Sequence, residues 1–186
     1  MGLTVAKPCL GSAVLASALS FEGGRNWLAA YTRPRHEAAV AQQLEAKGLA
    51  FLLPTFIRAR RWSDRVQRVV EPLFPSYVFV NASRGEHVRV LQTAGVINLV
   101  SVAGRPAPLR AEDVAMLREC AARPRQFEPH PFLSIGQKVR VTRGPFAGWE
   151  GVLANRKNSQ RLVISFEHVM RSVSVDLAGA DVEAVN

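Results

Sequence analysis

Apolar and polar positions in the first part of the chain switch between the spacing of strands and the spacing of helices. Residues 26–32 predict a first strand, with apolar residues over most of its length. A helix follows, because Pro34 suits its first turn, Glu37 suits its positive end and Gly48 suits its C-terminus. Alanine, valine and leucine at helical spacing give that helix one apolar face.

The same part of the chain predicts further strands and two more helices. Residues 49–54 form an apolar strand that a proline ends, and residues 56–70 are polar at the centre and β-branched at the ends, which favours a long hairpin. The later predicted elements are a strand at 77–80, a short helix at 84–92 with Val88 and Leu91 inward, a strand at 97–102, and a helix at 110–122 with Val114, Met116 and Leu117 inward. This order favours an α+β fold, in which helices pack on one antiparallel sheet over residues 25–122.

The pattern changes after residue 122. Residues 123–131 contain three prolines and no apolar period, so we expect a flexible linker at 123–133. Short strand-like runs separated by Gly and Asn then fill residues 134–186, and they are centred on 138–141, 149–154, 162–166, 172–176 and 182–184. Five short, β-branched strands predict a small five-stranded barrel, not a helical hairpin.

Charge indicates the kind of partner. The chain has 186 residues and a net charge of +9, and residues 25–122 hold 14 basic against 8 acidic side chains, a net of +6. Such an excess favours a polyanionic partner, usually nucleic acid. The hydrophobic content of 48% is enough for a buried core.

Several classes are disfavoured. The two cysteines and four histidines form no metal, nucleophile or phosphate-loop pattern, so we expect no enzyme, no metal site and no cofactor. Widely separated cysteines suggest a reducing compartment, the cytoplasm. No apolar run is long enough to span a bilayer. Residues 9–19 resemble a secretion signal only faintly, and we expect a disordered leader over residues 1–24.

Two stretches resemble the NusG family of transcription elongation factors. The motifs "NWLAAYTRPRHE", "LPT" and "EPLFPSYVFV" resemble its N-terminal domain, and "GQKVRVTRGPFAGWEGVL" resembles its KOW motif. A KOW motif alone also occurs in ribosomal proteins, so an RNA-binding or ribosome-binding protein acting in translation is the alternative. The forms "YTRPRHE" and "ARRWSDR" look closer to the RfaH and UpxY antiterminators, and Ser76 stands where housekeeping members usually have glycine.

The resemblance implies a monomeric regulator that binds RNA polymerase, with an SH3-like KOW barrel for a second partner. The patch that docks on the clamp helices of the polymerase β′ subunit would comprise Tyr31, Phe74, Pro75, Tyr77 and Phe79. Alternation along an extended strand places Tyr77 and Phe79 on one side and leaves Val78 and Val80 for a buried face. The alternative is that the four aromatic residues are only core.

A second set of residues is basic. Five arginines and a tryptophan lie within residues 58–68, and arginines can bind phosphates while an indole stacks on a base. By resemblance, this hairpin and the start of the first helix contact the non-template DNA strand near the transcription bubble. The candidates are Arg33, Arg35, His36, Arg58, Arg60, Arg61, Trp62 and Arg65. The alternative is a solvated hairpin whose charges keep the edge soluble.

Two weaker sites complete the set. The loop at 81–87 lies where RfaH-like proteins contact the polymerase gate loop, with Arg84 and His87 as candidates, although an ordinary loop is the alternative. In housekeeping NusG proteins, an apolar loop of the KOW domain contacts either Rho or a small-subunit ribosomal protein. By resemblance, the corresponding residues of this chain are Phe166, Val169 and Met170. Methionine can adapt to different partner surfaces.

Overall fold

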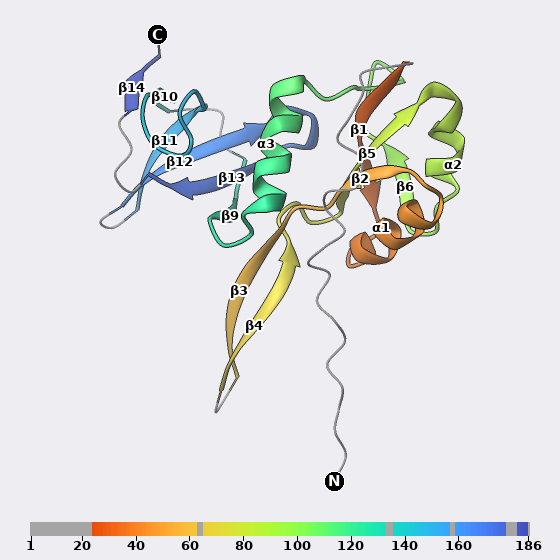
Figure 1. Ribbon diagram of the computed structural model, residues 1–186, viewed down its shortest axis with the longest axis horizontal. Coiled ribbons are helices and arrows are strands. Elements are labelled where there is room, and N and C mark those ends of the chain that lie inside the picture. The colour runs from red at the N-terminus through yellow and green to blue at the C-terminus, as the bar shows by residue number, and fades with distance from the viewer. Residues whose placement is uncertain (1–23, 63–64, 133–135, 157–158, 178–181, 186) are drawn as a thin grey trace.

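The two largest of the four β-sheets in the described residues lie on either side of a helix (Figure 1). The computed structural model describes residues 24–62, 65–132, 136–156, 159–177 and 182–185, so the predicted leader, apart from Gly24, lies outside the described residues. Around the sheets lie three α-helices and a short 3-10 turn: α1 (Glu37–Ala46), η1 (Arg84–Glu86), α2 (His87–Leu91) and α3 (Ala111–Ala122). None of the helices in the described ranges is long and apolar enough to cross a membrane.

The N-terminal sheet is antiparallel, has the order β2-β5-β1-β6 and is buried on both faces. Its strands are β1 (Arg25–Thr32), β2 (Ala50–Leu52), β5 (Tyr77–Ser83) and β6 (Val96–Leu99). On one face, Val78 and Val80 of β5 pack with Val40 and Leu44 of α1. On the other face, Phe79 packs toward α3. The α+β prediction is confirmed, and the two-residue period explains why neighbouring side chains join different clusters.

A long hairpin projects from this body (Figure 1). Strands β3 (Thr55–Trp62) and β4 (Arg65–Pro72) pair from Thr55 opposite Pro72 to Trp62 opposite Arg65, which confirms the predicted hairpin. At its base, the Ile57 N–H donates to the carbonyl oxygen of Pro124 at 3.2 Å. The hairpin is therefore joined to the segment that connects the two halves of the chain. A small ribbon, β7 (Ser101–Val102) with β8 (Arg105–Pro106), precedes α3.

The C-terminal sheet contains the five predicted strands and one more. Its order is β14-β10-β11-β12-β13-β9, with every neighbouring pair antiparallel. The strands are β9 (Phe127–His130), β10 (Lys138–Val141), β11 (Glu150–Arg156), β12 (Ser159–Phe166), β13 (Arg171–Asp176) and β14 (Val182–Ala184), and a 3-10 turn, η2 (Glu167–Val169), precedes β13. In the part of the chain described, the outer strands β9 and β14 do not pair with each other, so the predicted closure into a barrel stays a prediction.

The prediction of a flexible linker is wrong for residues 127–130. They form β9, in which Phe127 lies opposite Val175 of β13. The Phe127 side chain is 1% exposed and packs against Phe146 and Trp149, with ring centroids 5.8 and 6.0 Å away. Pro129 is tolerated because β9 is an edge strand, where a missing N–H breaks no ladder on its free side. One isolated aromatic in a proline-rich segment leaves no periodic signal.

The inward positions predicted for the short helix are also wrong. Val88 is 58% and Leu91 45% exposed, whereas Val90 is fully buried. The helix begins at His87, because the 3-10 turn at 84–86 comes first and is held by a reciprocal cap between Ser83 and Glu86. The tighter 3-10 turn shifts the phase of the residues that follow.

We expect Phe127→Ala to lower the free energy of unfolding by about 3–5 kcal/mol, because it empties a packed aromatic site. Urea denaturation followed by far-ultraviolet circular dichroism would measure the loss. Val70→Ala is the control, since Val70 is 61% exposed and its change should stay within about 0.5 kcal/mol. Equal stability of the two variants would show that β9 is only loosely attached.

Candidate functional site

The structure brings the predicted clamp-binding residues together at one end of β1 and β5. Tyr31 and Tyr77 are paired across the two strands, and their half-buried rings lie 5.4 Å apart. Phe74 and Phe79 meet edge to face at 5.3 Å and are 1% and 0% exposed. Pro75 is exposed. The set is one cluster, with tyrosines at its rim and phenylalanines inside.

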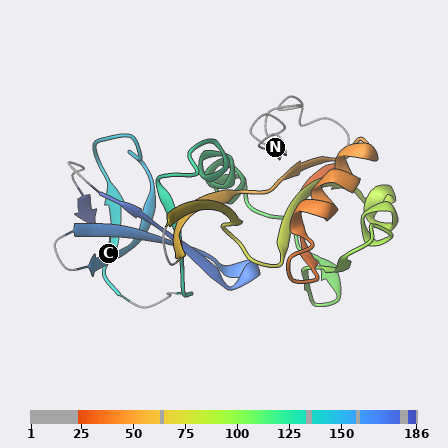
Figure 2. The ribbon, with the colours of Figure 1, turned by 90° about the horizontal axis from the view of Figure 1, so that it is seen from below.

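The C-terminal half covers the phenylalanine part of this cluster. The Phe166 ring, at the end of β12, meets the Phe74 ring edge to face at 5.1 Å. Phe166 and Val169 are each 2% exposed and belong to the same hydrophobic cluster as Phe74 and Phe79. Met170 alone of the three predicted partner-loop residues is exposed, at 59%. The two apolar surfaces that the sequence indicates for different partners therefore lie against each other, and Figure 2 shows the two sheets on either side of this seam.

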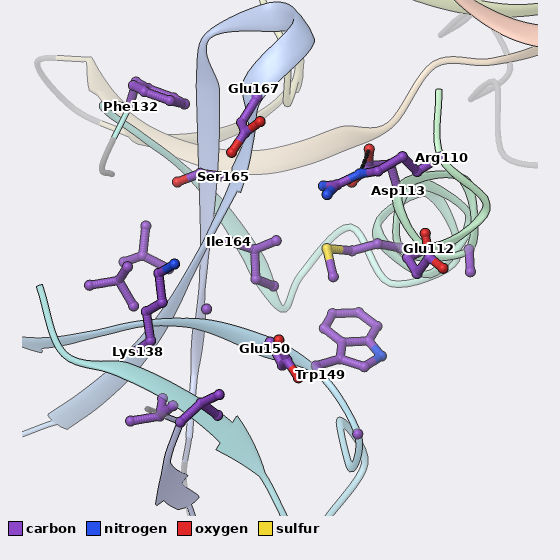
Figure 3. A pocket seen from close by; sticks show the side chains of 18 residues that line it. Arg110, Glu112, Asp113, Phe132, Lys138, Trp149, Glu150, Ile164, Ser165 and Glu167 are labelled. Carbon is purple, nitrogen blue, oxygen red and sulfur yellow. Dashed lines mark hydrogen bonds and ion pairs between the residues drawn. The ribbon is translucent and has the colours of Figure 1, made fainter. Parts of the chain in front are cut away.

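The rim of the seam is charged. Arg110, which directly precedes α3, donates twice to the buried Asp113 carboxylate at 3.0 Å, and Glu167 of η2 adds a further favourable charge. These interactions raise the pKa of Arg110. Arg110 lines a cavity of about 630 Å³ between α3 and the C-terminal sheet, with Trp149 and Ile164 on its apolar floor (Figure 3). The contact between the halves is thus apolar inside and polar at its edge.

Burial and a nearby charge act in opposite directions on the pKa of Tyr77. Burial raises the pKa of its hydroxyl above the usual value of 10, and nearby Arg171 at the start of β13 opposes that rise. Arg171 is a residue that the sequence analysis missed, because its proximity to Tyr77 depends on the packing of the two halves. The tyrosine rim therefore experiences the charge of a cation from the C-terminal half.

The basic candidates fall into two groups. Arg33, Arg35 and His36 are exposed in the turn before α1, and Arg35 has a left-handed backbone with φ of 65°. On the hairpin, Arg58 is exposed and lies 3.6 Å from the Glu71 carboxylate. The backbone places the remaining hairpin candidates toward the far end of β3 and β4, while their side chains lie outside the described part of the structure: Arg60, Arg61, Trp62 and Arg65.

The predicted gate-loop residues lie on a regular element. Residues 81–83 end β5, Arg84 is exposed in the 3-10 turn, and His87 is the half-buried first residue of α2. Glu86, which no sequence pattern singles out, caps this turn and forms ion pairs with Arg25 and Arg89. The hydrogen bonds from Ser83 and these two cations lower the pKa of Glu86. The segment is a capped turn, and Arg84 is its exposed cation.

A family model described as "Transcription termination factor nusG" matches residues 25–118, half of the chain. The chain belongs to the NusG family. It is 38% identical over 103 residues to the "Transcription termination/antitermination protein NusG" of Deinococcus radiodurans, which covers 46% of this chain and 54% of that protein. The chain thus spans about half of the length of that relative. The protein of the same name from Pseudomonas aeruginosa is 29% identical over 140 residues, or 72% of this chain and 78% of that one.

A solved structure shares the fold of this NusG-family chain. The structure titled "Domain interaction in Thermotoga maritima NusG" superposes with a TM-score of 0.54 and 22% sequence identity, covering 87% of this chain and 98% of that one. At this identity the likeness concerns the fold. The match extends past residue 118 and so includes C-terminal strands that the family model does not reach.

We expect Tyr77 to titrate above pH 10 in the intact protein. Since the chain has two tyrosines, ultraviolet titration of the Tyr31→Phe variant isolates it. A raised pKa means that the folded state holds the proton more tightly. The resulting stability is fully present below about pH 10 and is lost as the pH rises through the folded pKa. Titration at or below pH 10 would contradict the packing described for this ring.

Proposed function

We propose that this protein is a transcription elongation and antitermination factor that docks on the clamp helices of the RNA polymerase β′ subunit. Membership of the NusG family and the names of the similar proteins support the general role. The contact between Phe74 and Phe166 is the observation that supports docking through the aromatic cluster. This contact supports the proposal, because a surface that packs an aromatic ring within the chain has the apolar character of a protein-binding hot spot.

Docking requires the C-terminal half to move away, because Phe74 and Phe79 are almost fully buried in the closed arrangement. Polymerase then competes with Phe166 and Val169 for one surface. Opening also exposes those two residues beside Met170, and we propose that this loop then recruits a second partner, either Rho or a small-subunit ribosomal protein. Binding is thus a population shift, in which polymerase selects the open form.

We further propose a specialised role similar to that of RfaH and UpxY proteins. The sequence features that support it are the basic hairpin at 58–68 and the serine in "FPSY". On this proposal the hairpin and the turn before α1 contact the non-template strand. Arg33, Arg35 and His36 are exposed, as such contact requires. Recruitment by DNA and docking by aromatic residues use separate parts of the molecule, so separate variants can test them.

Phe166→Ala should strengthen binding to RNA polymerase by about tenfold or more, because weakening the closed form raises the fraction that is competent to bind. Tyr77→Ala should weaken binding, because it removes a rim aromatic. Surface plasmon resonance with purified polymerase would measure both effects. Met170→Ala is the matched control in the covering loop, since its side chain is exposed and contributes little to closure.

Circular dichroism must show that both variants keep their secondary structure. Unchanged affinity of a folded Phe166→Ala variant would show that closure does not limit docking. Unchanged affinity of a folded Tyr77→Ala variant would reject the aromatic patch. Binding to isolated ribosomal RNA without any affinity for polymerase would instead favour a role in translation.

The double variant Arg60→Ala, Arg61→Ala should bind elongation complexes with a weaker salt dependence. If each arginine contacts one phosphate of a single strand, the slope of log K against log salt should flatten by about 1.4. Trp62→Ala should cost about 1–3 kcal/mol of recruitment if the indole stacks on a base. Crosslinking from the hairpin tip to the non-template strand tests whether the two are in contact. A complete lack of crosslinks would contradict the proposed role of the hairpin in DNA binding.

A further inference from the structure

The residues 74–77 form a tight turn with an unusual third position. The Tyr77 N–H donates to the Phe74 carbonyl oxygen at 3.1 Å, and Pro75 occupies the second position. Ser76 has φ of 69°, in the left-handed region. Proline second and a positive φ third are the signature of a type II turn, in which the third position normally requires glycine. A serine therefore holds a conformation that disfavours its own side chain.

A buried carboxylate meets this turn from α1. Glu37, the first residue of the helix, is 4% exposed, and its Oε1 accepts the Ser76 N–H at 2.7 Å. That distance is typical of a hydrogen bond to a charged acceptor. The carbonyl oxygen of Ser76 in turn accepts the Thr32 N–H at 2.8 Å. The backbone of Ser76 is thus held at its N–H by α1 and at its carbonyl by the end of β1.

The carboxylate selects one orientation of the peptide between Pro75 and Ser76. Type I and type II turns differ mainly by a flip of this central peptide. In the type II form the Ser76 N–H points at Glu37 and satisfies it. In the flipped form Glu37 would lose this donor and face a carbonyl oxygen, and a buried charge without its donor is strongly unfavourable. Glu37 thereby offsets the preference of serine for negative φ.

The turn orients the exposed parts of two candidate surfaces. Pro75 lies at its tip, and Tyr77 leaves it directly into β5, opposite Tyr31. The exposed Arg35 and His36 immediately precede Glu37 in the chain. One carboxylate therefore links the backbone that carries the aromatic rim to the backbone that carries the basic turn.

We propose that Glu37 is a positioning residue that fixes the type II form of the turn at Pro75 and Ser76. It thereby holds the aromatic rim in register with the basic start of α1. The effect on polymerase binding rests on the function proposed above. The effect on the turn does not, and the two can be measured separately.

The test uses the full chain with Glu37→Ala, Ser76→Gly and the double variant, and Glu45→Gln is the control on an exposed glutamate of the same helix. The first measurement is the NMR shift of the amide proton at position 76. Glu37→Ala should move this signal upfield, because a charge-assisted hydrogen bond is lost. Glu45→Gln should leave it in place. A signal at position 76 that does not respond to Glu37→Ala would overturn the proposal.

The second measurement is affinity for RNA polymerase. Glu37→Ala should weaken binding by about tenfold, the effect expected for one lost hydrogen bond to a charged group. Ser76→Gly in the same chain should restore most of that loss, since glycine adopts the left-handed conformation without help. Rescue separates positioning from direct contact, because a glycine at 76 cannot replace a carboxylate that touches the partner. Failure of the rescue, with the amide shift changed, would overturn the positioning role.

One further variant and one further measurement distinguish the possible outcomes. If Glu37→Ala does not fold, Glu37→Gln replaces it, since the amide oxygen can still accept the Ser76 N–H as a weaker, uncharged acceptor; a smaller upfield shift is then expected, and no shift counts against the proposal. Ser76→Gly alone should raise the melting temperature by roughly 2–4 °C through release of backbone strain. If the wild-type chain has no affinity for polymerase, the proposed function fails, while the amide shift still decides the role of Glu37.

Discussion

One hydrophobic cluster runs through both halves of the chain, and the rest of the structure depends on it. The face of β1 and β5 that carries Ala29 and Phe79 is apolar, and α3 covers it only in part, through Leu117 and Cys120. The remaining apolar surface around Phe74 needs another cover, because large exposed apolar patches are rare on proteins that do not use them for binding. Phe166 and Val169 provide that cover. The N-terminal half therefore gains a complete core only by packing against the C-terminal half.

This constraint explains why the connecting segment is ordered. Phe127 is buried among Phe146 and Trp149, whereas the ion pair between Arg161 and Glu128 that also holds β9 has a half-exposed acid partner. Exposed ion pairs contribute little, and burial of a phenylalanine contributes much more. Strand β9 is therefore stabilised mainly by apolar packing against the C-terminal half. The segment between the end of α3 at Ala122 and Phe127 joins the two halves and lies next to the base of the β3–β4 hairpin.

Local pattern was enough to predict most of the strands and helices, but it missed strand β9 and did not predict how the elements contact one another. The predicted strands, hairpin and helices follow from apolar periods of two and 3.6 residues and from the positions of Pro and Gly. Each of these signals depends only on residues that are close together in the sequence. Residue Phe127 was missed because a single buried aromatic has no period. The approach of Phe166 to Phe74, and of Glu37 to Ser76 across 39 residues, depends on tertiary packing. Ser76 itself was visible in the sequence as a departure from glycine, but its compensating acceptor was not.

For the aromatic residues of "FPSYVFV", a role in the core and a role in docking do not exclude each other. Phe74 and Phe79 are core while the halves are together, and on the function proposed above they become surface when Phe166 moves away. On that proposal each phenylalanine has two alternative contacts, one within the chain and one with the outside partner, and the two compete. A cover that binds too tightly lowers the population that is open, and apparent affinity for the outside partner falls by the same factor. Because Tyr31 and Tyr77 stay half-buried at the rim, an incoming apolar surface has a first contact before the cover moves. The rim and the interior of one cluster can thus act in sequence, with the tyrosines meeting the partner and the phenylalanines completing the contact.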